Sequence, residues 1–225
     1  MWDEVKSCGA RRNLLAGQKR TKTMKEKEII HVFDFDGTLT YCDTLLLFIR
    51  YVNGPWRLWL SLLLFLPKLV LMKLHLRDNG RTKEELFAWH FRGEKDSDFA
   101  EDCERFAEEY PDVLREAGMA TLRKALNQGE RVFVVSASID NWVELFFRGA
   151  AQVLGTQLEV KDGKLTGRFT TPNCYGTEKV KRLQAALPDL ERNRDKYYII
   201  AYGDSRGDKE MLEFADERHY KPFRR

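Results

Sequence analysis

The chain has 225 residues, of which 43% are hydrophobic and 32% are charged, and this composition excludes a wholly disordered or fibrous protein. The formal net charge is +3, of which residues 1–23 carry +4, so that 3 − 4 = −1 remains for the rest. Because the body of the chain is nearly neutral, its charge does not favour nucleic-acid binding. The length suits one domain with a large insertion, or two small domains.

Residues 1–27 are predicted to be a disordered basic tail, with attraction to anionic lipid as an alternative role for its charge. Met24 is an alternative start of translation, because the first predicted strand follows it closely. No apolar stretch with a small-residue cleavage site follows the basic residues, so we expect no secretory signal peptide. The cysteines lack the spacing of a zinc or redox site, which favours free thiols in a cytoplasmic protein. They are Cys8, Cys42, Cys103 and Cys174.

Three short apolar runs each end in a polar residue. They are residues 29–33 followed by Asp34, residues 131–135 followed by Ser136, and residues 197–203 followed by Asp204. Because helical stretches separate these runs, they predict parallel strands of an α/β sheet with a Rossmann-like arrangement. Ligands of such sheets bind outside the carboxyl ends of the strands, so the three polar residues are expected to meet there.

The region between the first two runs, residues 41–127, contains no comparable strand pattern and is predicted to be mostly helical. Since it separates two strands that carry candidate site residues, we expect it to form a cap over the site. Residues 158–171 alternate around Asp162-Gly163, which predicts a small β-hairpin. The expected organisation is a tail at 1–27, a catalytic core at 28–40 and 128–225, and a helical cap at 41–127.

Residues 56–76 are the most apolar part of the predicted cap. Its uninterrupted apolar stretches are shorter than the roughly 20 residues of a simple bilayer span, and the segment carries charge. Pro67 is expected to kink or break the helix. On a helical wheel one narrow polar stripe leaves a wide apolar face, which favours a helix in a membrane interface as much as one packed inside the cap or a dimer. The stripe consists of Arg57, Ser61, Lys68 and His75.

The central motif places two carboxylates two residues apart at a strand end, where both can project into a pocket. Acids at a turn are common, but here three further motifs follow in order. The four motifs are Asp34-Phe-Asp36-Gly-Thr38, Ser136, Lys179, and Gly203-Asp204-Ser-Arg-Gly-Asp208. The set resembles the four motifs of the haloacid dehalogenase (HAD) superfamily, over about residues 29–225. A calcium loop is not expected, since the DxDxDG spacing and its closing Glu are absent.

The resemblance implies phosphomonoester hydrolysis that depends on Mg²⁺ and passes through an aspartyl-phosphate. Asp34 would be the nucleophile, and Asp36 would protonate the leaving alkoxide and then activate water. A cluster of carboxylates makes a raised pKa plausible for Asp36, because it disfavours ionisation of all of them. The resemblance assigns Mg²⁺ to the side chains of Asp34 and Asp204 and to the main-chain carbonyl of Asp36.

The same resemblance gives supporting roles to four other residues. Ser136 would hydrogen-bond a phosphoryl oxygen, and Lys179 would neutralise the nucleophile and the phosphoryl group. Asp208 would orient Lys179 or support the metal shell. Thr38 would help to hold the loop around the phosphate. Phosphoryl transfer depends mainly on such positioning and charge neutralisation.

The helical insertion after the first motif is similar to the C1 cap of subfamily IB, the phosphoserine-phosphatase-like branch. Phosphoserine is not the expected substrate, because Gly37, Asp43 and Ala137-Ser138 stand where that enzyme has Ser, an amine-binding Glu and Gly residues. Asp43, Ser138 and Arg50 are the candidate substrate contacts.

Other stretches resemble the phosphatidylglycerophosphatase C group of this superfamily. They are Phe48-Ile-Arg-Tyr51, residues 58–76, and Cys174-Tyr-Gly-Thr-Glu-Lys179-Val. This implies a lipid phosphate as substrate and a peripheral contact of residues 56–76 with the inner face of the membrane. The alternatives are a soluble small-metabolite phosphatase and a non-catalytic phosphate-binding or membrane-tethering protein. The oligomeric state is not predicted.

Overall fold

The structure is a computed structural model that describes residues 27–74 and 76–224, so the predicted basic tail lies outside the described residues except for Lys27. Its core is a five-stranded sheet in the order β3-β2-β1-β6-β7, in which every neighbouring pair is parallel. The strands are β1 (Glu28–Phe33), β2 (Arg131–Ile139), β3 (Gln152–Thr156), β6 (Tyr197–Gly203) and β7 (Glu217–Tyr220). The predicted α/β class with a parallel sheet is confirmed.

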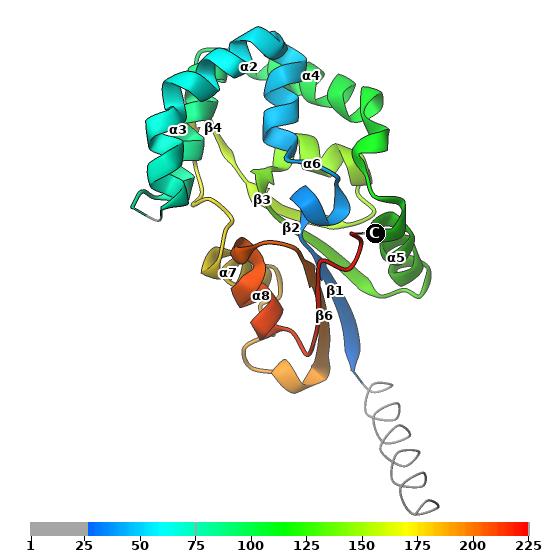
Figure 1. Ribbon diagram of the computed structural model, residues 1–225. Coiled ribbons are helices and arrows are strands. Elements are labelled where there is room, and N and C mark those ends of the chain that lie inside the picture. Colours follow the sequence, from blue (N-terminus) through cyan, green and yellow to red (C-terminus); the bar gives the residue numbers. More distant parts are fainter. Residues whose placement is uncertain (1–26, 75, 225) are drawn as a thin grey trace, which may run out of the picture.

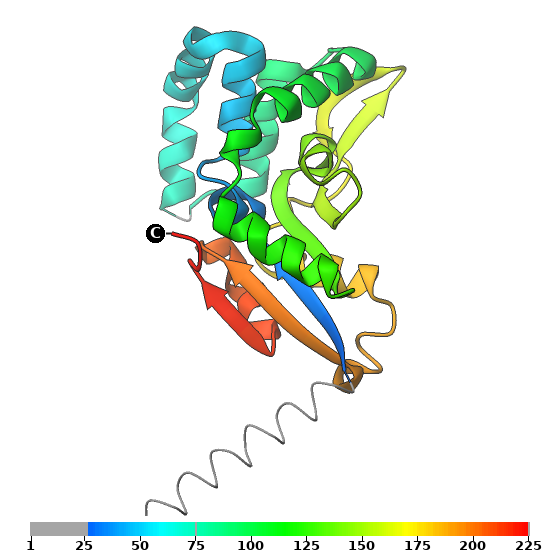
Figure 2. The same ribbon diagram turned by 90° about the vertical axis from the view of Figure 1, so that its right-hand side faces the viewer.

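Helices cover both faces of this sheet and one edge of it (Figures 1 and 2). The long helices are α2 (Thr44–Lys73), α3 (Asn79–Phe91), α4 (Asp96–Glu109), α5 (Glu116–Asn127), α6 (Asp140–Phe147), α7 (Thr177–Ala186) and α8 (Lys209–Phe214). The short turns are η1 (Phe35–Leu39), η2 (Pro111–Val113), η3 (Arg194–Lys196) and η4 (Arg206–Asp208).

Alternation along the strands divides the interior into two hydrophobic cores. Ile30 and Val32 of β1 pack in the core that α7 and α8 cover. Phe33 packs in the other core, together with residues of α5, α6 and the helices after η1. Because successive side chains of a strand point to opposite faces, a central strand must be apolar on both, which explains the continuous apolar runs in the sequence.

The edge strands β3 and β7 were not predicted from the sequence. β3 has five residues and contains Gly155, and β7 reads Glu-Arg-His-Tyr and is partly exposed. An edge strand needs no apolar residues on its open side, and charged residues there discourage pairing with other chains. An edge strand can therefore lack the continuous apolar run by which the central strands are recognised in the sequence.

A separate layer of α2, α3, α4 and a β-hairpin stands above the carboxyl edge of the sheet (Figure 1). The hairpin pairs β4 (Leu158–Lys161) with β5 (Lys164–Phe169), and Asp162 and Gly163 form its turn with φ of 52° and 70°. The predicted hairpin is therefore present. It joins the cap layer, since the N–H of Leu165 donates to Glu94 O at 2.9 Å and the N–H of Gly93 donates to Leu165 O at 2.8 Å.

The predicted cap, residues 41–127, is too long at its C-terminal end, where it includes helix α5. Leu122 and Ala125 of α5 are buried against the sheet, in the same core as Val132 and Val134 of β2. The apolar stripe of α5 thus covers a sheet face, and the helix belongs to the core rather than to the cap. The cap helices end before η2.

Helix α2 bends at Gly54, and the prediction of a break at Pro67 is wrong. Gly54 has φ 80° and ψ 162°, a conformation that essentially only glycine adopts, while the backbone around Pro67 stays helical. A proline removes one hydrogen bond from a helix, whereas a positive φ redirects the chain. Figure 1 shows the first segment of α2 rising from the sheet and the second descending beside α3.

The second segment of α2 exposes a wide apolar side, while its covered side carries Ser61 and Lys68 together with the buried, apolar Phe65. Ser61 is buried with its Oγ 2.9 Å from Nε2 of His90, and Lys68 pairs with Glu85 of α3 at 2.7 Å. The exposed side is apolar, and Trp59 and Leu63 are each 67% exposed. We call this side the outer apolar face. It consists of Trp56, Trp59, Leu60, Leu63, Leu64, Leu66, Val70, Leu71, Leu74 and Leu76.

The outer apolar face excludes the interpretation in which the wide apolar side of residues 56–76 packs inside the cap. Contacts with a bilayer or with a second protein surface stay open. Among the described residues, α2 is the one helix that is long and apolar enough to cross a membrane by length and composition.

Replacing Gly54 with alanine should lower the free energy of unfolding by about 1–3 kcal/mol, because a Cβ is strained in this conformation. Among the described residues, no atom outside the adjoining chain and the helix's own backbone lies within 4 Å of the Cβ position, so the cost comes from the local backbone conformation. Urea denaturation measures the change. Asn53→Ala, in the preceding helical turn, is the control and should change the free energy by less than about 0.5 kcal/mol. Equal effects of both substitutions would contradict the assignment of the bend.

Candidate active site

The register of the sheet brings the three predicted strand-end residues together. The last residue of β1 lies opposite Val134 of β2 and Tyr202 of β6. Asp34 follows β1 directly, and its N–H donates to Tyr202 O at 2.9 Å. Ser136 and Asp204 lie two residues beyond these partners, so all three reach the same edge, and all three are buried.

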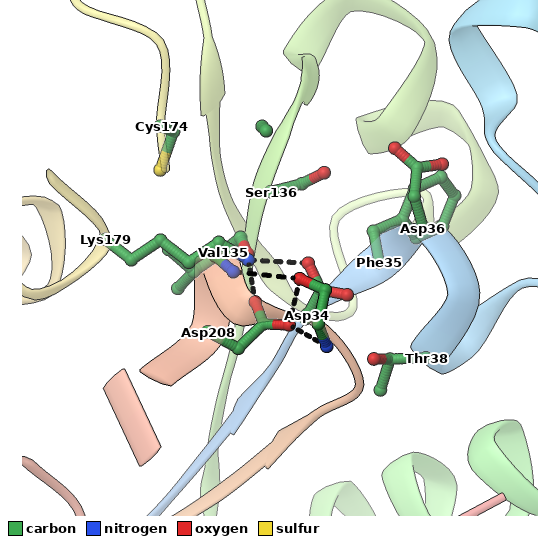
Figure 3. A network of polar contacts seen from close by, with 12 residues as sticks. Asp34, Phe35, Asp36, Thr38, Val135, Ser136, Cys174, Lys179 and Asp208 are labelled. Carbon is green, nitrogen blue, oxygen red and sulfur yellow. Dashed lines mark hydrogen bonds and ion pairs between the residues drawn. The ribbon is translucent and has the colours of Figure 1, made fainter. Parts of the chain in front are cut away.

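Lys179 forms the centre of the polar network at this edge (Figure 3). Its Nζ lies 2.5 Å from Asp34 Oδ1, 2.6 Å from Asp208 Oδ1 and 2.8 Å from the carbonyl oxygen of Val135. These three acceptors use all three N–H groups of the ammonium. Helix α7, which carries Lys179 in its first turn, is thereby tied to the ends of β1 and β2.

The pKa values within this network are set by burial and by the mutual attraction of its charges. Burial raises the pKa of Asp34 to about 7, although the Lys179 ammonium opposes the rise. Burial disfavours the charged form of Lys179, but Asp34 and Asp208 outweigh it and raise the pKa of Lys179 above its usual value. Burial also acts on Asp208, yet Lys179 and the donors of Ser205 lower its pKa overall. Lys179 and Asp208 therefore form an ion pair at neutral pH.

Asp208 also shapes the loop after β6. Its Oδ2 accepts the N–H groups of Asp204 and Ser205, at 3.1 Å and 2.9 Å, and the Ser205 hydroxyl at 2.8 Å. Gly203 makes this turn possible, since a Cβ there would lie 2.6 Å from the Cβ of Asp208. Both oxygens of Asp208 are thus occupied, which suits a residue that positions Lys179 and Asp204.

The carboxylates of this edge can hold a divalent cation. Ligand atoms of Asp34, Asp204 and Asp208 lie within 4.8 Å of one another. Within residues 27–74 and 76–224, Oδ2 of Asp34 is buried and has no hydrogen-bond partner. Such an oxygen is costly to bury alone, and hard oxygen ligands are those that Mg²⁺ prefers. The donor set fits Mg²⁺, with Asp34 and Asp204 as ligands and Asp208 behind them.

Two neighbours hold Asp204 in place. The hydroxyl of Thr38 donates to Asp204 Oδ1 at 3.4 Å, and a guanidinium nitrogen of Arg224 contacts Oδ2. Gly37, with φ 80°, lets the first loop approach closely, because a Cβ there would lie 2.7 Å from Asp204 Oδ2. The structure thus places Thr38 beside Asp204, while Arg224 was not foreseen.

Asp36 lies on the other side of Asp34 from Lys179 in the view of Figure 3. Its Oδ1 accepts the N–H of Thr44 at 2.9 Å and the Thr44 hydroxyl at 2.7 Å, and its Oδ2 accepts the Ser138 hydroxyl. Burial, followed by the Asp43 charge, raises the pKa of Asp36, while Lys83 and the hydrogen bonds oppose the rise. Burial thus raises the pKa of Asp36 more than the neighbouring carboxylates do, whereas the sequence suggested the carboxylate cluster as the cause.

The predicted substrate contacts have different positions. A cavity of about 390 Å³ is lined by Asp34, Asp36 and Asp43, and Asp43 also caps α2 through the N–H of Leu46 at 3.1 Å. Ser138 is buried and is used by Asp36. Arg50 is exposed and does not line the cavity, so the structure does not bring it together with the other predicted residues.

The cap adds cavity residues that were not predicted. Lys83 of α3 lines the cavity, and its Nζ donates to the carbonyl oxygen of Ala137 at 2.6 Å. In the sequence it resembles a surface lysine. One signal was present, because positions 79, 82, 83 and 86 share one helical face, and all four line the cavity. The opposite wall is apolar and consists of Leu62, Leu69 and Met72 of α2.

Comparison with known proteins identifies the family. Residues 31–213 match the model of haloacid dehalogenase-like hydrolases. The protein CicA of Caulobacter vibrioides is 33% identical over 218 residues, which cover 95% of each chain. The same match is found in two strains, NA1000 / CB15N and ATCC 19089 / CIP 103742 / CB 15.

Solved structures share the fold. A protein of unknown function from Bordetella pertussis Tohama I aligns with a TM-score of 0.68 and 19% identity, over 85% of this chain and 89% of that one. Phosphoserine phosphatase with an analogue of its phospho-aspartyl intermediate aligns with a TM-score of 0.59 and 19% identity, over 85% of each chain. The family match includes the four motifs, and the structure unites their side chains at one sheet edge. The chain belongs to the haloacid dehalogenase-like hydrolases.

Proposed function

We propose that this hydrolase is a Mg²⁺-dependent phosphomonoester phosphatase in which Asp34 is transiently phosphorylated. The observation that carries the proposal is the state of the Asp34 carboxylate. One oxygen is held by Lys179, and the other is buried without a partner among the described residues. A carboxylate that Lys179 holds in place can attack phosphorus through one oxygen and bind Mg²⁺ through the other.

Residues around Asp34 would balance the charge of the phosphoryl group. Lys179 faces the nucleophile, and the hydroxyl of Ser136 remains free to donate because its oxygen accepts the N–H of Ser138 at 2.9 Å. Asp34, Asp204 and the carbonyl of Asp36 would hold Mg²⁺. When bound, the ion supplies positive charge that offsets the phosphate and the clustered carboxylates.

Asp36 would move the protons. Its raised pKa favours the protonated form that the first step needs. In that step the bond from phosphorus to the leaving oxygen breaks, a bond to Asp34 forms, and the proton of Asp36 passes to the alcohol. In the second step Asp36 takes a proton from water, and the attacking water oxygen releases phosphate from Asp34.

We propose that the substrate is a lipid phosphate, and that the outer apolar face contacts the membrane. One helix supports both parts of this proposal, because α2 lines the cavity with Leu62, Leu69 and Met72 and exposes its other side. Burial of an exposed large apolar side chain contributes roughly 1.5–3 kcal/mol, so a few of them suffice for reversible docking. The cavity would then open close to the lipid headgroups.

A soluble small-metabolite phosphatase is the second candidate. It is supported by the shared fold of phosphoserine phosphatase. The outer apolar face would then need another cover, such as a second copy of the chain. The two candidates differ in where the face is buried, and this difference can be measured.

Asp34→Asn should lower Mg²⁺-dependent phosphate release by more than about 10³-fold, because the amide cannot form the phosphorylated intermediate. The measurement is phosphate release from a panel of micellar lipid phosphates and soluble phosphoesters, with and without EDTA. Asp195→Asn, at an exposed aspartate of η3, is the matched control and should retain full activity. Phosphate release by Asp34→Asn at the wild-type rate would contradict the assigned nucleophile.

Lys179→Met should lower the free energy of unfolding by about 3–5 kcal/mol without Mg²⁺, because Asp34 and Asp208 lose their buried partner. In the wild type the lowered pKa of Asp208 adds stability above its unfolded pKa, and this stability is lost as the pH falls. In the variant both carboxylates should have raised pKa values, so its stability should fall as the pH rises. The deficit should be larger at pH 8 than at pH 5 in denaturant titrations. Lys181→Met, at an exposed position of α7, should show no such pH dependence.

The pair Trp59→Gln and Leu63→Gln should weaken binding to anionic phospholipid vesicles at least about tenfold, because each change removes apolar area from the outer face. Vesicle co-sedimentation measures the binding. Val160→Gln, at a 43% exposed position on the hairpin, is the control. A different result would contradict the membrane contact: the wild type does not bind vesicles, and it forms a dimer that these two changes dissociate. The outer apolar face would then be an interface between two copies of the chain.

A further inference from the structure

Lys83 brings a positive charge of the cap into the cavity beside the carboxylates. Its Nζ donates to the carbonyl oxygen of Ala137, between Ser136 and Ser138 of β2, at 2.6 Å. Among the described residues that line the cavity, the cations are Lys83 and Lys179. Since Lys179 is fully used by its three acceptors, Lys83 is the cation with donor groups to spare.

The nearby carboxylates do not use these spare donors. Lys83 lies close enough to Asp36 and Asp43 for their charges to act on its pKa, which burial lowers. Asp36 accepts hydrogen bonds from hydroxyl and backbone donors, and Asp43 accepts the N–H of Leu46. An ammonium has three N–H groups, and the hydrogen bond that the structure gives Lys83 goes to the carbonyl of Ala137.

Neutral polar side chains lie between Lys83 and a groove that adjoins the cavity. Asn79 of α3, and Asn173 and Tyr175 of the loop before α7, line the cavity and also border an adjoining open groove. The cap and this loop are in direct contact, because a Cβ at Gly80 would lie 2.9 Å from the Cβ of Asn173. A leaving group that occupies this part of the cavity can therefore contact a cation and amide groups.

We propose that Lys83, assisted by Asn79 and Asn173, binds a second anionic oxygen group on the leaving alcohol of the substrate. The inference rests on the proposed phosphatase function and narrows its substrate class. The substrate is a phosphomonoester whose alcohol also carries a phosphodiester or a carboxylate. A lipid headgroup and a soluble metabolite can both supply this chemistry, and an ammonium and amide N–H groups are its natural partners.

A purely structural role of Lys83 makes a different prediction. If Lys83 only fastens the cap to β2 through Ala137, its loss should affect all substrates equally. A binding role for the second anion should affect only substrates that carry one. It should act mainly through KM, because the contact is remote from the bond that breaks and is present in the bound substrate and in the transition state alike.

The test compares two matched substrate pairs at saturating Mg²⁺. The soluble pair is 3-phosphoglycerate and glycerol 3-phosphate, and the lipid pair is short-chain phosphatidylglycerophosphate and short-chain phosphatidic acid. Lys83→Met should lower kcat/KM about tenfold to a hundredfold for the doubly acidic member of the preferred pair, chiefly through KM. The change for its partner should stay below about threefold. Lys83→Arg should restore part of the loss, and Lys95→Met in the cap should have no effect.

A binding measurement separates this inference from the proposed function. Isothermal calorimetry on Asp34→Asn, with and without Lys83→Met, measures the affinity of the same four compounds without turnover. If the wild type hydrolyses none of them while doubly acidic compounds still bind through Lys83, the proposed function fails and the subsite stands. Equal losses for both members of each pair, or no preference for the doubly acidic members in either measurement, would overturn the proposal. Melting temperatures show whether the Lys83 variants are folded.

Discussion

The ion pairing of the buried Lys179 is the interaction on which the rest of the structure depends. Its three hydrogen bonds join α7, the end of β1, the carbonyl edge of β2 and the turn after β6. A buried ammonium is unfavourable alone, and so are the carboxylates of Asp34 and Asp208. Each charge is tolerated because the others are present, so the site forms as a unit when the sheet and its two helical layers close.

The network around Lys179 leaves an excess of carboxylates over cations at the carboxyl edge of the sheet. Lys179 neutralises about one of the two carboxylates that it contacts, while Asp36 and Asp204 add further acids at the same edge. Burial raises the pKa of Asp34, Asp36 and Asp204, which means that the folded protein disfavours their ionised forms in the absence of a cation. A site of this kind is suited to a divalent cation and to proton transfer, both of which the proposed phosphatase reaction would use.

Helix α2 of the cap carries apolar residues on its exposed side as well as on its covered side, where Phe65 is buried. Where α2 meets α3, Ser61 contacts His90 and Lys68 contacts Glu85, while the exposed side carries tryptophan and leucine. Burial and the neighbouring Arg57 charge lower the pKa of His90 to about 4, so the imidazole at this interface is neutral at physiological pH. A helix whose outward side is apolar is suited to a surface that is itself apolar. The cap thus links the proposed catalytic cavity to the proposed membrane contact.

The sequence by itself determined the α/β class, the three central strands, the hairpin and the set of residues at the sheet edge. The strands and the polar residue after each of them follow from local rules, because buried parallel strands require apolar runs and the polar residue after each run must lie at the carboxyl edge. Lys179 and Asp208 were predicted from the resemblance of the motifs. Tertiary structure alone decided the edge strands β3 and β7, the side of the molecule that α2 exposes, and the entry of Lys83 and Arg224 into the site. An edge strand lacks the apolar run of a central strand, and the helical face that carries Lys83 does not itself show which distant segment packs beside it. A helical wheel likewise shows that α2 has two faces, but only its neighbours determine which face is covered.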